Sequence, residues 1–206
     1  GDSYVMQGVK ELPAGTYVFG AYIGAAKQTR NQKESNRDSI TGVFLWARES
    51  EVPVATDNPD LGYKYKWAHS SKFNVAVVVP DTGEYKGYLD AGLRISSTNA
   101  NYVVWDNATL YYFGNMSEAD ALNEMAKIDM AATVAIADTC LAHKMNVDSL
   151  ALLNEGITAG KAIATADQLW QLNEDLYWAI NKATKSISDY KSFNNAIVAA
   201  EEAAAG

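Results

Sequence analysis

Short apolar stretches in the first half of the chain alternate with polar positions. They recur at a spacing of about 8–15 residues and are separated by Gly, Asp, Asn or Pro. A period of two is typical of strands that bury one face, and many short, regularly spaced strands favour a β-sandwich. We predict strands at 4–12, 16–26, 41–49, 52–56, 72–79, 85–95 and 102–112.

The alternation also assigns residues of these strands to faces. The strand at 41–49 turns Val43, Leu45 and Ala47 inward and leaves Trp46 as an exposed aromatic residue. In the strand at 16–26, Tyr22 lies on the face opposite the core. The positions of that strand expected in the core are Tyr17, Phe19, Ala21, Ile23 and Ala25.

From Asn115 onward the apolar period becomes that of an α-helix. Ser117 and Asp120 predict an N-cap for a long helix at roughly 117–144. A second helix begins near Asp148, a third follows Thr165 with Gln168 completing a capping box, and a fourth covers about 189–204. Short connections favour antiparallel neighbours.

The predicted fold class is therefore α+β in two domains. Residues 1–114 form an antiparallel β-sandwich, and residues 115–206 form an antiparallel bundle of three to four helices.

Charge is divided unevenly between these halves. Residues 1–114 hold 11 basic and 12 acidic residues, a net of −1, whereas residues 115–206 hold 6 and 13, a net of −7. A negative chain without a basic cluster disfavours nucleic acid and anionic membrane surfaces. The sequence contains no run of about 18 apolar residues, so we expect no membrane insertion by this segment. We expect neutral partners, or a protein partner for the acidic helices.

Three stretches, at 7–26, 41–47 and 101–114, carry a resemblance to a known family. Together they resemble the galactose-binding-like jelly-roll domains of secreted glycan-degrading and glycan-binding proteins from Gram-negative polysaccharide users. The matching residues are Gln7, Leu12, Pro13, Ala14, Gly15, Tyr17, Asp106, Asn107, Leu110 and Tyr112. Two positions depart from the family pattern, which usually has Trp at Tyr102 and often an aromatic residue at Ala108. The helical half resembles FIVAR-type three-helix spacers more loosely.

The resemblance implies glycan binding at the loop tips of the jelly roll. Carried onto this chain, it points to Arg30, Asn36, Trp67, His69, Asn101 and Tyr102. Sugars stack on aromatic rings and hydrogen-bond to polar side chains, and these residues offer both kinds of group. An alternative platform is the outward face bearing Tyr22 and Trp46.

Asp106 has two interpretations. It could ligate a structural Ca²⁺, as related modules do, or it could be a buried carboxylate satisfied by backbone N–H groups. We expect no other cofactor.

Catalytic motifs are missing from the sequence. His69 and His143 stand in different halves, and no pattern places a nucleophile beside a base. Taken with this absence, the resemblance implies a non-catalytic carbohydrate-binding module with a helical spacer, in an exported, extracytoplasmic protein whose signal has been removed. The alternative is a structural or protein-interaction module of a cell-surface protein, and a glycoside hydrolase comes third.

Overall fold

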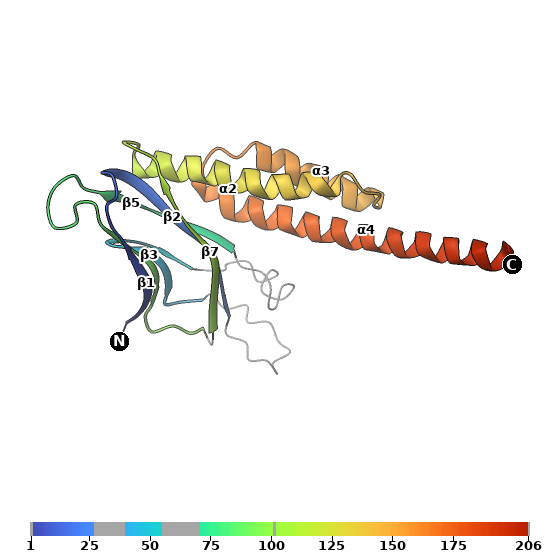
Figure 1. Ribbon diagram of the computed structural model, residues 1–206, viewed down its shortest axis with the longest axis horizontal. Helices are drawn as coiled ribbons and strands as arrows, with labels where there is room; N and C mark the ends of the chain where they lie inside the picture. The colour runs from blue at the N-terminus through green and yellow to red at the C-terminus, as the bar shows by residue number, and fades with distance from the viewer. Residues whose placement is uncertain (1, 27–39, 55–70, 101, 206) are drawn as a thin grey trace. The chain divides into compact units, whose positions relative to one another are not determined.

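The chain is α+β, with strands in its first half and helices in its second (Figure 1). The computed structural model describes residues 2–26, 40–54, 71–100 and 102–205. The strands are β1 (Ser3–Val9), β2 (Gly15–Ala26), β3 (Val43–Ala47), β4 (Ser50–Pro53), β5 (Ser71–Val79), β6 (Leu89–Ile95) and β7 (Tyr102–Tyr112). The helices are α2 (Glu118–Cys140), α3 (Val147–Lys161), the short 3₁₀ helix η1 (Ala166–Gln168) and α4 (Leu169–Ala205).

Within the described residues, the strands form two antiparallel sheets. One has the order β1-β6-β3-β4 and the other the order β5-β2-β7. Residues of β3 and β4 contact β5, and residues of β2 contact β3, so the sheets pack on each other. The seven strands predicted from the alternating pattern are confirmed, with ends that shift by a few residues.

The core between the sheets comes from alternate positions, as the pattern predicts. Phe19 and Ile23 of β2, Leu45 of β3 and Leu93 of β6 are all buried. Among the predicted core positions of β2, only Ala25 is less than fully buried. Burying such apolar side chains is the main stabilisation of a two-sheet fold.

The opposite face of β2 is also buried, which the strand pattern does not predict. Val18 is fully buried in a cluster with Ala76 of β5 and with Ala121 and Met125 of α2. The first turns of α2 therefore cover this part of the sheet. Alternation within one strand cannot reveal such a cover, because the helix that provides it begins some hundred residues later in the chain.

α2 begins where the sequence predicts. The Ser117 hydroxyl accepts a hydrogen bond from the Asp120 backbone N–H at 3.1 Å and donates one to the Asp120 carboxylate at 2.7 Å. The Thr16 hydroxyl of β2 donates to the Met116 carbonyl at 2.6 Å. These bonds cap the helix and fix the chain just before it against the sheet.

α2, α3 and α4 share a second core, which contains Met130 and Val134 of α2, Leu153 of α3 and Leu176 of α4. α3 runs antiparallel to α4, since Ser149 near the start of α3 donates to the Lys182 carbonyl, whereas Gly156 further along α3 lies against Leu176, earlier in α4. Gly160 lets α3 approach α2 closely, because a Cβ there would lie 2.8 Å from Met130 Cε.

One helix prediction is wrong. The third and fourth predicted helices are a single helix, α4, which runs without a break from Leu169 to Ala205. This span contains no Gly or Pro, so nothing in its sequence ends the helix. The predicted capping box is present at its start, where the Gln168 side chain accepts the Thr165 backbone N–H at 3.1 Å.

Internal contacts divide the chain into two compact units, 1–125 and 126–206. The division falls within α2, after Met125, whereas the change in sequence pattern comes at Gly114. The first turns of α2 therefore belong with the strands.

Candidate functional site

The predicted loop-tip site lies almost entirely outside the described residues. Arg30, Asn36, Trp67, His69 and Asn101 all fall there. Tyr102 begins β7, where its backbone pairs with Ala26, but its side chain is not described. Glycan binding at the loop tips therefore stays a prediction.

The alternative platform is wrong as a single surface, because Tyr22 and Trp46 belong to different sheets. Tyr22 lies in β2, with Lys72 Nζ 5.2 Å from its ring centroid. Trp46 lies in β3, and the ring of Tyr4 packs edge-on against it at 5.3 Å between centroids. This contact leaves Trp46 half-buried rather than exposed. Alternation gives the face within a strand but not the sheet to which the strand belongs.

The outer side of the sheet β1-β6-β3-β4 gathers aromatic and charged side chains. The strand register sets two neighbouring rows on this side. In one, Tyr4 pairs with Arg94 and Arg94 with Phe44; in the other, Met6 pairs with Gly92 and Gly92 with Trp46, which itself pairs with Glu51. We call this surface the aromatic face. It comprises Tyr4, Met6, Phe44, Trp46, Glu51, Gly92 and Arg94.

Gly92 makes the aromatic contact on this face possible. Tyr4 and Trp46 come from strands that flank β6, and Gly92 places no side chain between their rings. A Cβ at Gly92 would lie 2.0 Å from the Val5 carbonyl oxygen, so β1 also passes too close for any larger residue. Tyr4 remains 47% exposed and Met6 56% exposed, which leaves apolar surface open to solvent.

Arg94 supplies a fixed polar edge beside these rings. Its Nε and Nη2 each donate to the Glu51 carboxylate at 2.8 Å, and its Nη1 lies 3.2 Å from Asp2 Oδ2. The guanidinium also stacks over the Phe44 ring, 4.2 Å from the centroid. Two parallel hydrogen bonds and a stacked ring restrict an arginine strongly, so the Arg94 guanidinium has a fixed position on this face.

Hydrogen bonding to Glu51 raises the pKa of Arg94 further above its ordinary value, so this residue stays charged. The pKa of Asp2 is lowered, first by a hydrogen bond from Ser96 and then by the charge of Arg94. The face therefore carries one cation between two carboxylates. The carboxylate oxygens and the guanidinium N–H groups of this face can hydrogen-bond to neutral hydroxyl groups.

Sequence reasoning missed Tyr4, Glu51 and Arg94 as members of one surface. A signal was present, since alternation along 89–95 turns Arg94 away from Leu93 and the core. The register that sets Arg94 between Tyr4 and Phe44 depends on pairing among three strands distant in the sequence, and no local pattern encodes it.

Two of the residues that carry the family resemblance hydrogen-bond to the backbone of the turn before β2. The Tyr17 hydroxyl donates to the Pro13 carbonyl and the Tyr112 hydroxyl to the Ala14 carbonyl, both at 2.9 Å. A shallow hollow of about 640 Å³ lies beside this turn. It is lined by Glu11, Leu12, Pro13, Ala14, Pro80, Asp81, Lys86 and Gly87.

Asp106 and Asn107 form a β-bulge. The pairing between β2 and β7 shifts by one residue here, and Asn107 has a φ of 51°. The Asp106 carboxylate accepts the Asn107 N–H at 2.7 Å. Asp106 is exposed, so the interpretation as a buried carboxylate is wrong, although its bond to a backbone N–H is present. Among the described residues, no group of three or more His, Cys, Asp and Glu side chains could hold a metal ion.

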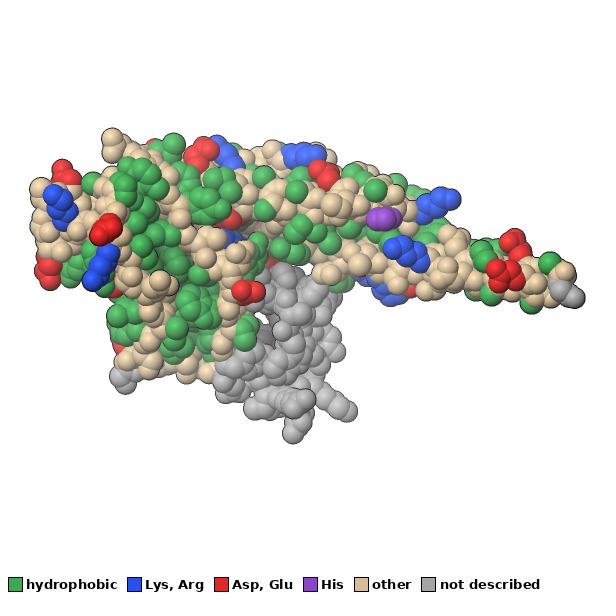
Figure 2. All heavy atoms as spheres, viewed as in Figure 1, with side chains coloured by type: hydrophobic (Ala, Val, Ile, Leu, Met, Phe, Trp, Pro, Cys, Tyr) green, Lys and Arg blue, Asp and Glu red, His purple; other side chains and the backbone are tan. Residues whose placement is uncertain are grey.

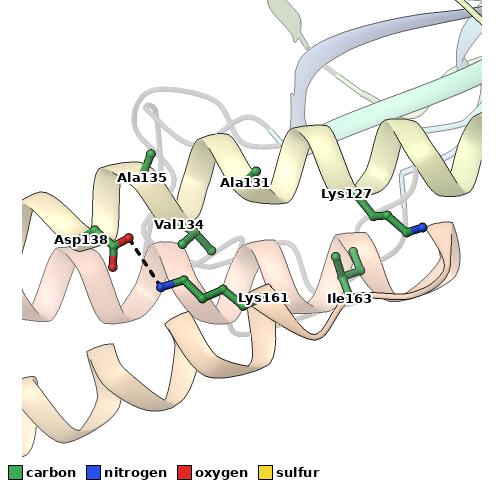
Figure 3. Close-up of a pocket in the computed structure, with 8 residues that line it drawn as sticks. Lys127, Ala131, Val134, Ala135, Asp138, Lys161 and Ile163 are labelled. Atoms are coloured by element: carbon green, nitrogen blue, oxygen red, sulfur yellow. Dashed lines mark ion pairs between the residues drawn. The ribbon is translucent and has the colours of Figure 1, made fainter.

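The helical unit has a hollow of about 390 Å³ beside α2 and the end of α3 (Figure 3). The residues that line it include Ala131, Val134 and Ala135 of α2 and Ile163, and Lys161 and Asp138, which also line it, form an ion pair at 3.7 Å. Alanine, valine and isoleucine walls offer few hydrogen-bonding groups. This hollow is therefore a weaker candidate than the aromatic face.

No helix in the described part of the chain is both long enough and apolar enough to cross a bilayer. Comparison with protein-family models, with curated proteins and with solved structures found no match for this chain. The aromatic face is therefore a candidate site on its geometry alone.

Proposed function

We propose that the first unit is a non-catalytic carbohydrate-binding module with a galactose-binding-like jelly-roll topology. It would bind a neutral glycan and be joined to a helical spacer within an exported, extracytoplasmic protein. The observation that carries the proposal is the aromatic face, where the Tyr4 and Trp46 rings adjoin the fixed Arg94 guanidinium.

The chemistry of a sugar ring matches this surface. One side of a pyranose presents C–H groups that stack on aromatic rings, while its hydroxyls need donors and acceptors at the edge of the ring. Tyr4 and Met6 leave apolar surface exposed on this face, and Arg94 and Glu51 provide the polar edge. Residues 1–114, which contain all the strands of the described part, carry a net charge of only −1, and this suits an uncharged ligand.

A titration of the whole chain against a panel of neutral glycans tests the proposal. With a glycan that binds, Trp46→Ala should weaken the affinity by roughly tenfold, about 1.4 kcal/mol. Trp105→Ala is the matched control, because Trp105 is also a partly exposed strand tryptophan but belongs to β7 in the other sheet. Its affinity should equal that of the unchanged protein.

Other outcomes count against the proposal in distinct ways. Binding that survives Trp46→Ala but is lost with Trp67→Ala would move the site to the loop tips. Binding that is lost only with Trp105→Ala would move it to β7. No binding to any member of a broad neutral panel would refute the carbohydrate-binding function itself.

A further inference from the structure

The last part of α4 has no cover within the described residues. From Ser188 to Ala205, the segment that we call the α4 extension, every residue is exposed. The loop between α2 and α3 ends level with the start of this segment, because the Asn146 backbone N–H bonds to the Ser186 hydroxyl at 2.8 Å. Figure 1 shows α4 continuing past the ends of α2 and α3.

The α4 extension repeats the pattern of the buried part of the helix. Upstream, the buried face of α4 includes Leu176, Ala179, Ala183 and Ser186, which follow one another at alternating spacings of three and four. The same spacing continues without a shift through Tyr190, Phe193, Ile197, Ala200 and Ala204. This is the a and d pattern of a helix that packs against another helix.

Exposing this stripe is unfavourable. Phe193 is 63% exposed and Ile197 40% exposed, although both lie on the face that the bundle buries upstream. Figure 2 shows hydrophobic and acidic side chains together at this end of the helix. Ser192, Asn194 and Asn195 have low intrinsic helix propensity, so packing would add to the stability of the segment.

We propose that the α4 extension binds the α4 extension of a second copy of this chain, with the two helices antiparallel. The sizes of the stripe residues support this arrangement. The large residues, Tyr190 and Phe193, precede the small ones, Ala200 and Ala204. Antiparallel packing of a against d positions sets Tyr190 opposite the Ala200 of the other copy, and Phe193 opposite Ile197. Parallel helices would instead stack Tyr190 on itself and Ala204 on itself, which gives layers of unequal width.

The charges of the segment favour the same direction. Glu201 and Glu202 make the last part of the α4 extension acidic. In the antiparallel arrangement, Lys191 of one copy lies on the same side of the interface as Glu201 of the other. With Tyr190 level with Ala200, Lys191 and Glu201 are offset by two residues. At a rise of about 1.5 Å per residue, this offset is about 3 Å along the helix axis. The opposed helix dipoles also attract.

The self-association goes beyond the proposed glycan binding and does not depend on it. A second copy of the chain would join two β-rich units through their helical ends and so make the protein bivalent. Two sites on one assembly raise the apparent affinity for a repetitive polymer without any new contact.

Sedimentation equilibrium of the whole chain over a wide concentration range tests the interface. We expect a concentration-dependent dimer that Phe193→Asp reduces to monomer. Val198→Asp is the matched control, because Val198 is 51% exposed on the same segment but lies outside the stripe. The control should dimerise as the unchanged chain does. Circular dichroism of both variants checks that the helix remains formed.

Disulfide cross-linking tests the direction. A chain carrying both Tyr190→Cys and Ala200→Cys should form covalent dimers under mild oxidation, whereas each single variant should form few. A chain that is monomeric at every concentration, or a Phe193→Asp variant that dimerises normally, would overturn the interface. Single Tyr190→Cys chains that cross-link as efficiently as the double variant would overturn the antiparallel arrangement.

Discussion

Tyr17 and Tyr112 pack together at the end of the sheet β5-β2-β7. Their rings lie 4.9 Å apart between centroids, and their hydroxyls bond to the successive carbonyls of Pro13 and Ala14. β2 and β7 pair at these two residues. The Leu-Pro-Ala-Gly turn is thus held by two tyrosines from neighbouring strands. This explains physically why the turn motif and the closing-strand motif occur together in one sequence.

Removing either hydroxyl should loosen this turn. We expect Tyr17→Phe to lower the free energy of unfolding by about 1 kcal/mol, because the hydrogen bond that the buried Tyr17 donates to the Pro13 carbonyl is lost. Tyr112→Phe should cost less, about 0.5 kcal/mol, since Tyr112 is half exposed and water can replace the bond. Urea unfolding measures both. Tyr111→Phe, an exposed tyrosine on the same strand with its side chain on the opposite face, is the control and should change nothing.

High pH should destabilise the fold through the Tyr17–Tyr112 pair. Burial raises the pKa of Tyr17 above its ordinary value near 10, and the charge of Tyr112 adds to the effect. The folded state therefore keeps the proton that the unfolded chain releases, so this contribution is present below about pH 10 and is lost as the pH rises further. Urea unfolding at a series of pH values above about 10 should show that the free energy of unfolding falls more steeply with pH for the unchanged protein than for Tyr17→Phe. Equal slopes would contradict the assignment.

The bulge in β7 should require a residue that tolerates its backbone. Asn107 has a φ of 51°, a conformation that costs most residues roughly 1–2 kcal/mol. Asn107→Gly should keep nearly full stability, whereas Asn107→Val should lose about that amount in thermal or urea unfolding. Ala108→Val introduces the same side chain at the next residue, which has no positive φ, and should have little effect. A stable Asn107→Val variant would show that the bulge can be removed.

Gly92→Ala should separate β1 from β6. The added methyl would lie 2.0 Å from the Val5 carbonyl oxygen, a backbone atom that can move only by breaking the pairing. We expect a loss of about 2–3 kcal/mol and faster hydrogen exchange along β1. Gly8→Ala in the neighbouring strand meets the Tyr88 hydroxyl, a side-chain tip that can rotate away, and should be milder. Equal exchange rates in the two variants would contradict this explanation.

Local pattern was sufficient to predict most of the fold. Alternation located the described strands and the inward face of β3, where Val43, Leu45 and Ala47 are all buried. Capping residues located the starts of α2 and η1, because those bonds join residues close in the sequence. The predicted break in α4 is wrong, because the sequence between the third and fourth predicted helices contains no Gly or Pro that would end a helix.

The candidate site could not be predicted in the same way. The aromatic face depends on Tyr4, Trp46 and Arg94, whose strands meet only through the register of the folded sheet. Pairing of distant strands is decided by the whole core rather than by any one segment. Sequence alone therefore found aromatic candidates such as Trp46 but combined Trp46 with Tyr22 from the other sheet.

The packing of Ala121 and Met125 on Val18 decides how the protein can be dissected. A fragment ending at Gly114, where the strand pattern stops, would retain the described strands but lay bare Val18 and Ala76. Such a fragment would aggregate for a reason unrelated to its own strand sequences. The β-rich half needs the first turns of a helix that the sequence pattern assigns to its neighbour, so a soluble binding fragment must carry that beginning with it.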